Sequence, residues 1–148
     1  MKIRDIMSSR VTWAKADDSI GYAARLMAEQ DVGALPIVDG GRVVGMVTDR
    51  DIAVRGVAGR TSMEAPVRQI MTEDVMTCSP DDNLESALEL MSNEQVRRLP
   101  VCDPDGKLVG IVALADAAHR DPDKAEVGEA LDEICEPAGV HSQSPIFA

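Results

Sequence analysis

The residues best suited to chemistry lie in one short segment, Gly45–Asp51, where a predicted strand turns into a predicted helix. Backbone N–H groups at the start of a helix carry partial positive charge and favour a phosphate. Thr48 adds a hydroxyl donor, and the glycine lets a ligand approach the strand. Asp51 lies one turn into the helix, where its carboxylate can accept bonds from two neighbouring hydroxyls, as on a ribose. The same Thr and Asp spacing also fits a helix N-cap pair that needs no ligand.

The sequence contains two copies of one unit. Residues 3–40 match residues 67–104 in register, and the match continues after one extra residue in a turn. This unit is longer than the roughly 20 to 50 residues of solenoid repeats, so we expect two domain-sized copies that pack face to face about a pseudo-two-fold axis. Identical pairs include Arg4/Arg68, Met7/Met71, Asp17/Asp81, Pro36/Pro100, Gly45/Gly110 and Asp51/Asp116.

Each copy is predicted to be a short strand, a helix, a hairpin and a second helix. In the second copy, Asp82 with Glu85 three residues later predicts a capping box that opens an amphipathic helix. In the first copy, short apolar runs at 35–38 and 42–47 flank a turn signal and predict a hairpin, and a helix is expected from about 49 to 57. These elements indicate an α+β fold with tandem repeats.

The expected domain organisation follows from the repeat. In the last segment, apolar residues continue at helical spacing, at Val127, Leu131, Ile134 and Cys135. An amphipathic helix there either covers an apolar edge of its own chain or contacts a second copy, and Gly139–Ala148 is expected to be mobile. The expected segments are the first repeat at 1–60, a linker at 61–66, the second repeat at 67–120, and a C-terminal helix and tail at 121–148.

Composition excludes several classes of function. The 148 residues carry 15 Lys and Arg against 26 Asp and Glu, a formal net charge of −11, which repels polyanions. The three aromatic residues, Trp13, Tyr22 and Phe147, offer no stacking platform for single-stranded nucleic acid. Hydrophobic residues make up 45% of the chain, enough for a packed core. Nucleic acid is therefore not an expected partner.

Neither a membrane nor a metal is expected. The longest near-apolar run, Leu108–Ala115, is far shorter than the ~20 residues of a spanning helix. The first residues lack the apolar core of a secretory signal, so the cytoplasm is the expected location. Cys78, Cys102 and Cys135 show neither CxxC spacing nor a His at metal spacing, and we interpret them as buried thiols.

The doubled motifs closely resemble the CBS domain family. The first copy contains Ile-Arg-Asp-Ile-Met, Gly-Ala-Leu-Pro-Ile-Val-Asp and Gly-Met-Val-Thr-Asp-Arg-Asp, and the second Val-Arg-Gln-Ile-Met, Val-Arg-Arg-Leu-Pro-Val and Gly-Ile-Val-Ala-Leu-Ala-Asp. The match covers about residues 1–118 and is similar to stand-alone bacterial pairs, including hypoxia-response members from actinobacteria. It implies a Bateman module that binds AMP, ADP, ATP or S-adenosylmethionine in two related clefts and that commonly forms disc-like dimers.

The resemblance also implies roles for individual residues. The ribose-binding Asp of the family maps onto Asp51 and Asp116, and its phosphate-contacting hydroxyl maps onto Thr48. The second copy departs from this pattern with Ala113, which weakens the second cleft and makes the Asp51 cleft the expected tighter one. The residues before the strand proline, which line the adenine and phosphate region in the family, are Val32, Gly33 and Ala34 in one copy and Val96, Arg97 and Arg98 in the other.

Each cleft is further expected to use the first strand of the opposite copy. By that rule Thr77 and Cys78 join the Asp51 cleft, and Thr12 and Trp13 join the Asp116 cleft. Arginines supply local positive charge for a polyanion, and those before Pro100 can serve either cleft. The expected binding residues are Ala34, Pro36, Gly45, Thr48, Arg50, Asp51, Thr77, Cys78, Arg97, Arg98 and Asp116.

Together these features predict a regulatory module that senses an adenosine nucleotide, forms a homodimer and signals to an unidentified protein partner. Catalytic residues are not expected, because a ribose-holding Asp beside a phosphate-holding Thr needs no reaction to be useful. No cofactor is required beyond the adenosyl ligand. The alternative is a structural or interaction dimer that keeps the fold with little or no ligand affinity, which Ala113 and Ala115 favour for the second copy. An enzyme acting on a nucleotide is a more distant alternative.

Overall fold

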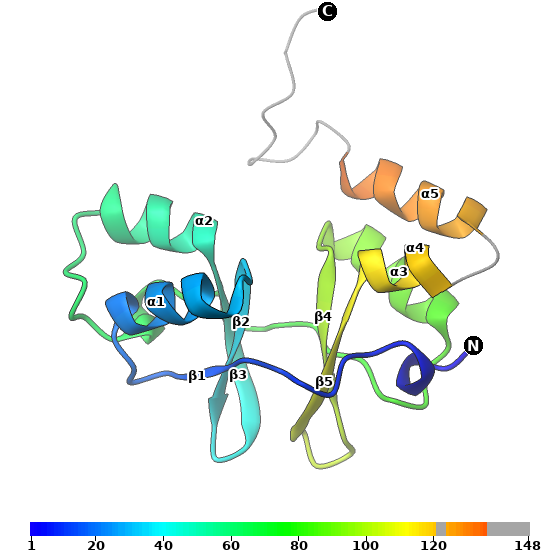
Figure 1. Cartoon of the computed structure of the whole chain (residues 1–148), viewed down its shortest axis with the longest axis horizontal. Helices are drawn as coiled ribbons and strands as arrows, with labels where there is room; N and C mark the ends of the chain where they lie inside the picture. Colours follow the sequence, from blue (N-terminus) through cyan, green and yellow to red (C-terminus); the bar gives the residue numbers. More distant parts are fainter. Residues whose placement is uncertain (121–123, 136–148) are drawn as a thin grey trace, which may run out of the picture.

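The computed structural model describes residues 1–120 and 124–135, and it shows two similar halves side by side (Figure 1). The predicted fold, helices and strands in two tandem repeats, is confirmed. The first half contains β1 (Ala14–Lys15), α1 (Ile20–Gln30), β2 (Ala34–Asp39), β3 (Arg42–Thr48) and α2 (Asp49–Asp51), which continues as a π-helix at Ile52–Val57. The second half contains α3 (Leu84–Glu94), β4 (Arg98–Cys102), β5 (Leu108–Ala113), α4 (Leu114–Arg120) and α5 (Lys124–Ile134).

Each half is built on an antiparallel hairpin, β2–β3 in the first and β4–β5 in the second. The β2–β3 turn needs its two glycines, since Gly40 and Gly41 have φ of 59° and 83°. In the first half the expected short first strand is present as β1, which pairs in parallel with β2. In the second half the expected first strand is reduced to a single parallel bridge between Cys78 and Val101.

One predicted helix start is wrong. Asp82 does not open α3 with Glu85, because its Oδ2 accepts a hydrogen bond from the N–H of Ser79 at 2.8 Å. The carboxylate thus closes the turn before the helix, and Asn83 takes the N-cap position. In the first half the N-cap is Ser19, whose hydroxyl accepts from the N–H of Tyr22 at 3.0 Å.

The first turn of each repeat packs on the opposite half. We call the 3-10 turns Ile3–Asp5 and Val67–Gln69, with the residues that follow them, the exchanged turns. Ile3 and Ile6 are buried in the core of the second half, whereas Val67 and Ile70 are buried in the core of the first. A sequence repeat and a packed half are therefore different units, because each half is completed by the other repeat.

Equivalent hydrogen bonds hold both exchanged turns in place. The N–H of Ile3 donates to the carbonyl of Asp82 at 3.0 Å, and the N–H of Val67 donates to that of Asp18 at 2.7 Å. Exposed ion pairs join the same segments, Arg4 with Asp81 and Arg68 with Asp17. Such exposed pairs add little stability, so the buried side chains and backbone bonds carry the contact.

The exchanged turns then run against the opposite hairpin at a glycine. Thr72 exchanges two backbone hydrogen bonds with Met46 of β3, at 3.0 and 2.8 Å. A Cβ at Gly45 would lie 2.8 Å from Met71 Sδ and 2.9 Å from the carbonyl oxygen of Thr72. A Cβ at Gly110 would likewise lie 2.8 Å from Met7 Sδ and 2.9 Å from the carbonyl oxygen of Ser8. A residue without a side chain is thus required at both positions.

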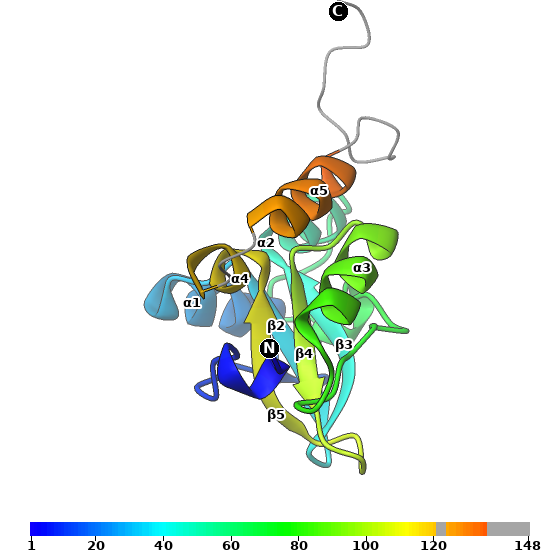
Figure 2. The same ribbon diagram turned by 90° about the vertical axis from the view of Figure 1, so that its right-hand side faces the viewer.

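The C-terminal helix α5 packs on the second half. Val127 and Ala130 are buried in its core against α3 and α4 (Figure 2). Leu131, expected on the apolar face, is instead exposed, because the buried face turns toward Ala130. The expected mobile tail at 139–148 lies outside the described residues, and the segment boundaries expected from the sequence stay predictions. Among the described residues, no helix has the length and apolar content needed to cross a bilayer.

The close contact at Gly45 generates the first prediction. Gly45→Ala should lower the free energy of unfolding by about 1 to 3 kcal/mol, because the new methyl group overlaps Met71 and Thr72. The melting temperature should fall by roughly 3 to 10 °C in a calorimetric scan. Gly128→Ala is the control, since nothing lies within 4 Å of that position and alanine favours a helix. Equal stability of Gly45→Ala and wild type would contradict the contact.

Candidate functional site

The two strand-to-helix junctions have the same backbone geometry. We call the junction with Thr48 and Asp51 the first candidate site, and the junction with Ala113 and Asp116 the second. The N–H of Thr48 donates to Oδ2 of Asp51 at 2.9 Å, and the N–H of Ala113 donates to Oδ2 of Asp116 at 3.0 Å. Both aspartates are half-buried. The repeat therefore presents two carboxylates held in the same way by the backbone.

At the first candidate site, Thr48 and Asp51 form a complete capping box. The Thr48 hydroxyl accepts from the N–H of Asp51 at 3.1 Å and donates to Oδ2 of Asp51 at 3.0 Å. The N-cap arrangement considered from the sequence is thus present in this structure. Because the hydroxyl donates to Asp51, it must rotate before it can donate to a phosphate.

Gly45 has a different role from the one that the sequence suggested. The space beside its Cα is filled by Met71 and Thr72 of the exchanged turn. The missing side chain of Gly45 therefore lets the exchanged turn of the other repeat pack against β3. The sequence suggested that it would let a ligand approach the strand. Its place in the binding set stays a prediction.

The hairpin register brings other predicted site residues to the junctions. Ala34 lies opposite Thr48, and Pro36 lies opposite Met46. Both Ala34 and Pro36 are buried in the hairpin, and Ala34 is the one beside Thr48. In the second half Arg98 lies opposite Ala113, with Arg97 just before it, and both arginines are exposed.

Two more charged residues lie at the first candidate site: Arg55, one of the arginines that the sequence offered as local positive charge for a polyanion, and Asp49, which sequence reasoning missed. Arg55 Nε lies 3.9 Å from Oδ1 of Asp51, and its Nη1 donates to the carbonyl of Ile70 at 3.4 Å. The i, i+4 spacing from Asp51 was the available signal. The Asp49 carboxylate lies beside Gly33 and accepts from the N–H of Arg50 at 2.8 Å.

Cys78 bridges to the hairpin of the second half, and Thr77 directly precedes it. The N–H of Cys78 donates to the carbonyl of Pro100 at 3.1 Å, and the N–H of Cys102 donates to the carbonyl of Cys78 at 2.9 Å. These bonds place Cys78 beside β4, whose first residue faces Ala113. The assignment of Thr77 and Cys78 to the Asp51 cleft stays a prediction.

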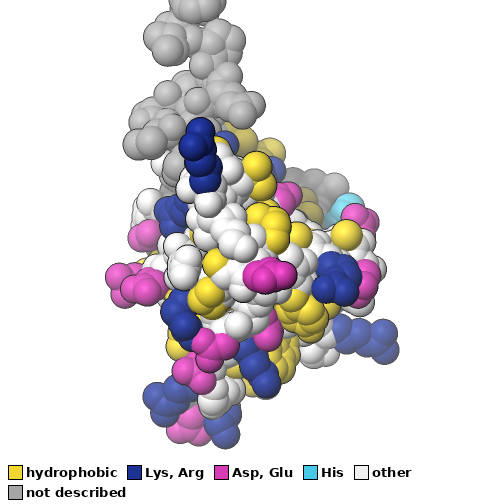
Figure 3. Space-filling model, turned by 90° about the vertical axis from the view of Figure 1, so that its left-hand side faces the viewer, with side chains coloured by type: hydrophobic (Ala, Val, Ile, Leu, Met, Phe, Trp, Pro, Cys, Tyr) yellow, Lys and Arg dark blue, Asp and Glu magenta, His cyan; other side chains and the backbone are white. Residues whose placement is uncertain are grey.

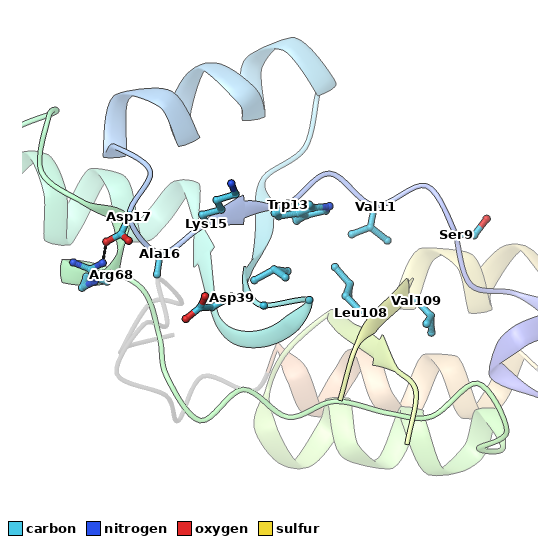
Figure 4. A pocket seen from close by; sticks show the side chains of 13 residues that line it. Ser9, Val11, Trp13, Lys15, Ala16, Asp17, Asp39, Arg68, Leu108 and Val109 are labelled. Carbon is cyan, nitrogen blue, oxygen red and sulfur yellow. Dashed lines mark ion pairs between the residues drawn. The ribbon is translucent and has the colours of Figure 1, made fainter. Parts of the chain in front are cut away.

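A cavity of about 610 Å³ lies at the opposite end of the hairpins (Figure 4). Trp13 lines it together with Leu108 and Val109 at the start of β5. The far end of β5, at Ala113, lies about 13 Å from Val109 at roughly 3.3 Å per residue, and Asp116 follows it in α4. Trp13 therefore lines a cavity beside the start of β5, the end of that strand far from Asp116, and its expected place in the Asp116 cleft stays a prediction.

The described residues hold no group of three or more His, Cys, Asp or Glu side chains that could bind a metal ion. Within the same residues, the ligand-binding chemistry of the two junctions rests on carboxylates, one hydroxyl and arginines. This donor set suits hydroxyl groups and anions.

Known proteins share this arrangement over nearly the whole chain. The family model described as the CBS domain matches residues 3–56 and 67–123. The CBS domain-containing protein YhcV of Bacillus subtilis is 39% identical over 132 residues, which cover 89% of this chain and 94% of the relative. Hypoxic response protein 1 of Mycobacterium tuberculosis is 37% identical over 141 residues, 94% of this chain and 97% of the relative.

Two solved structures have similar folds. The crystal structure of Hypoxic Response Protein I with two coordinated zinc ions is 36% identical, with a TM-score of 0.76, and the match covers 82% of this chain and all of that one. The CBS domain pair of protein MJ0100, in complex with 5-methylthioadenosine and S-adenosyl-L-methionine, is 31% identical, with a TM-score of 0.73 over 80% of this chain and 94% of the other.

The three thiols differ in environment. Burial is the main cause that raises the pKa of Cys78 to about 12, and Asp82 and Cys102 add to it. Burial also raises the pKa of Cys102, partly offset by a hydrogen bond with Thr77. Cys135, expected to be buried, is exposed just past the end of α5.

These environments predict one reactive thiol per chain. With a pKa of about 12, Cys78 is ionised to roughly one part in ten thousand at pH 8, so it should react slowly with Ellman's reagent. Cys102 should be slow as well, and Cys135 fast. In the Cys135→Ser variant the fast phase should disappear while the two slow ones remain until denaturant is added. A fast phase that survives this substitution would contradict the buried positions.

Proposed function

The chain belongs to the CBS domain family, and from that premise we propose that it is a regulatory module that binds an adenosine-containing compound at its two junctions. The observation that carries the proposal is the equivalent placement of Asp51 and Asp116, each anchored through Oδ2 by the backbone N–H three residues earlier. An anchored carboxylate can recognise the paired hydroxyls of a ribose at little cost in side-chain entropy. The structure of a relative with adenosyl ligands supports the class of compound.

Asp51 has accepting capacity left for a ribose. A carboxylate offers about four lone-pair directions, of which Oδ2 uses two for the backbone N–H and the hydroxyl of Thr48. Oδ1 is 3.9 Å from Arg55, outside hydrogen-bond distance. The two ribose hydroxyls can therefore bind Asp51 without breaking the capping box. Candidate ligands are AMP, ADP, ATP and S-adenosylmethionine.

The proposed role is sensing, without a chemical step. The junction residues hold a ligand between a hairpin and a helix, and Arg55 connects Asp51 to Ile70 of the exchanged turn. A ligand bound to Asp51 is thus connected through Arg55 to Ile70, where the two halves contact each other. A change there is what an unidentified partner protein would detect in the cytoplasm.

Ligand binding is tested by thermal stability. At one hundred times its dissociation constant, an adenosyl compound should add about 2.7 kcal/mol to the free energy of unfolding, which is roughly 5 to 10 °C. Asp51→Asn keeps an acceptor for Thr48 but loses the charge, so affinity at the first site should fall roughly 10- to 150-fold in a calorimetric titration. Asp105→Asn, which removes an exposed carboxylate from the β4–β5 turn, should bind as wild type does.

The alternative function, a structural dimer with little or no ligand affinity, predicts no stabilisation by adenosyl compounds. If the chain is a structural dimer of this fold, none of AMP, ADP, ATP, S-adenosylmethionine or 5-methylthioadenosine at millimolar concentration will shift the melting temperature. That result would exclude the sensing role.

We further propose that the module is a homodimer joined through the first half. Tyr22 on α1 and Val54 and Val57 on the π-helix are 42%, 48% and 64% exposed. Apolar side chains lie among charged ones on this face (Figure 3). The equivalent helices of the second half are covered by α5, whereas α1 has no such cover among the described residues. A second copy is the natural occupant, since dimers bury matching patches.

Light scattering tests the dimer. Wild type should have about twice the monomer mass of 15.8 kDa at micromolar concentration. The variant with Val54→Lys and Val57→Lys should be monomeric, because two buried charges oppose association. Leu131→Lys, which places the same charge on the exposed side of α5, should remain dimeric. A monomeric wild type, or a dimer lost only with Leu131→Lys, would contradict this interface.

A further inference from the structure

The two candidate sites share a backbone but differ in charge. The N–H of Asp49 donates to the carbonyl of Gly33 at 2.9 Å, and the N–H of Leu114 donates to that of Arg97 at 2.8 Å. These bonds, like those of Asp51 and Asp116, show that the two junctions match position by position. Differences between them therefore lie in the side chains that each repeat places on this common frame.

The first candidate site carries an additional carboxylate. A Cβ at Gly33 would lie 3.0 Å from Oδ2 of Asp49, so this carboxylate occupies the space beside the Gly33 backbone. Asp51 follows two residues later, and Arg55 is already directed to Asp51 and Ile70. A phosphate brought to this position would meet Asp49 at close range, and like charges repel.

The second candidate site carries cations at the same places. Arg97 and Arg98 replace Gly33 and Ala34, and both are exposed. The position of Asp49 is taken by Leu114, which is buried. Six equivalent positions can be compared. In the first half, two acidic and two basic side chains occupy positions 33, 34, 49, 50, 51 and 55. In the second half, one acidic and three basic side chains occupy positions 97, 98, 114, 115, 116 and 120.

We propose that the two sites select adenosine compounds by charge. The second site, around Asp116, takes the anionic, phosphate-bearing compound, which Arg97 and Arg98 attract. The first site, around Asp51, takes an adenosine compound without a phosphate, either neutral or cationic at the 5′ position. The inference rests on the proposed function, because it assigns ligand classes to the sites proposed there. It also reverses the order of affinity for nucleotides expected from the Thr48 hydroxyl alone.

Titration calorimetry with adenosine and AMP as probes tests the division, because they differ only by the phosphate. In wild type, AMP should bind most tightly at the second site. Replacing Arg97 and Arg98 by Gln should weaken that event by about tenfold or more and leave adenosine within about twofold. Replacing both by Lys should retain most of the preference. The ratio of the two affinities at the second site should also fall as salt is added.

Substitutions of the aspartates show at which of the two sites each binding event takes place. Asp116→Asn should remove the tight AMP event, and Asp51→Asn should leave it in place. Asp49→Asn should strengthen AMP binding at the first site by about threefold or more, with adenosine within about twofold. Asp105→Asn is the control for loss of one negative charge remote from both sites.

Three outcomes would overturn the proposal: an AMP to adenosine ratio unchanged by the Gln replacements, a tight AMP event lost with Asp51→Asn and kept with Asp116→Asn, or an Asp49→Asn variant with unchanged AMP affinity. Each of them leaves the proposed function intact, since both probes still bind. If neither adenosine nor AMP binds wild type, the proposed function fails, and the division of ligands fails with it.

Discussion

The exchange of first turns between the two repeats is the contact on which the rest of the structure depends. Ile3 and Ile6 complete the core of the second half, and Val67 and Ile70 complete that of the first. Full burial of one such side chain contributes about 1.5 to 3 kcal/mol, so four of them approach the total stability of a small domain. Neither repeat can keep its core alone, and the two halves fold as one unit.

The exchange also sets the geometry of the candidate sites. Gly45 lets Met71 and Thr72 approach β3 three residues before Thr48, and Arg55 contacts both Asp51 and Ile70. The ligand-holding carboxylate and the joint between the halves are therefore parts of one network. This connection gives a small bound molecule a physical route to the relative position of the halves.

The two repeats have the same backbone hydrogen bonds at their junctions, but their side chains have diverged. The two junctions retain the same hydrogen bonds, whereas Asp49 is replaced by Leu114 and Gly33 by Arg97. The surfaces have diverged as well, since α5 covers the helices of the second half and leaves α1 of the first exposed to a partner. A symmetric frame with unequal side chains can bind two ligands of different charge and still present one face for association.

Features that depend on neighbours along the chain could be predicted from the sequence alone. The repeat, the hairpins and the Thr48 and Asp51 capping box follow from turn residues and i, i+3 spacing. Local patterns failed where a competing contact was stronger, as at Asp82, which bonds Ser79 in place of capping α3. The half that receives each first turn, and the residues that fill the space beside Gly45, became clear from the three-dimensional packing. The two turns are so similar in sequence that a local pattern does not tell which core each enters, and the choice depends on contacts between residues far apart in the chain.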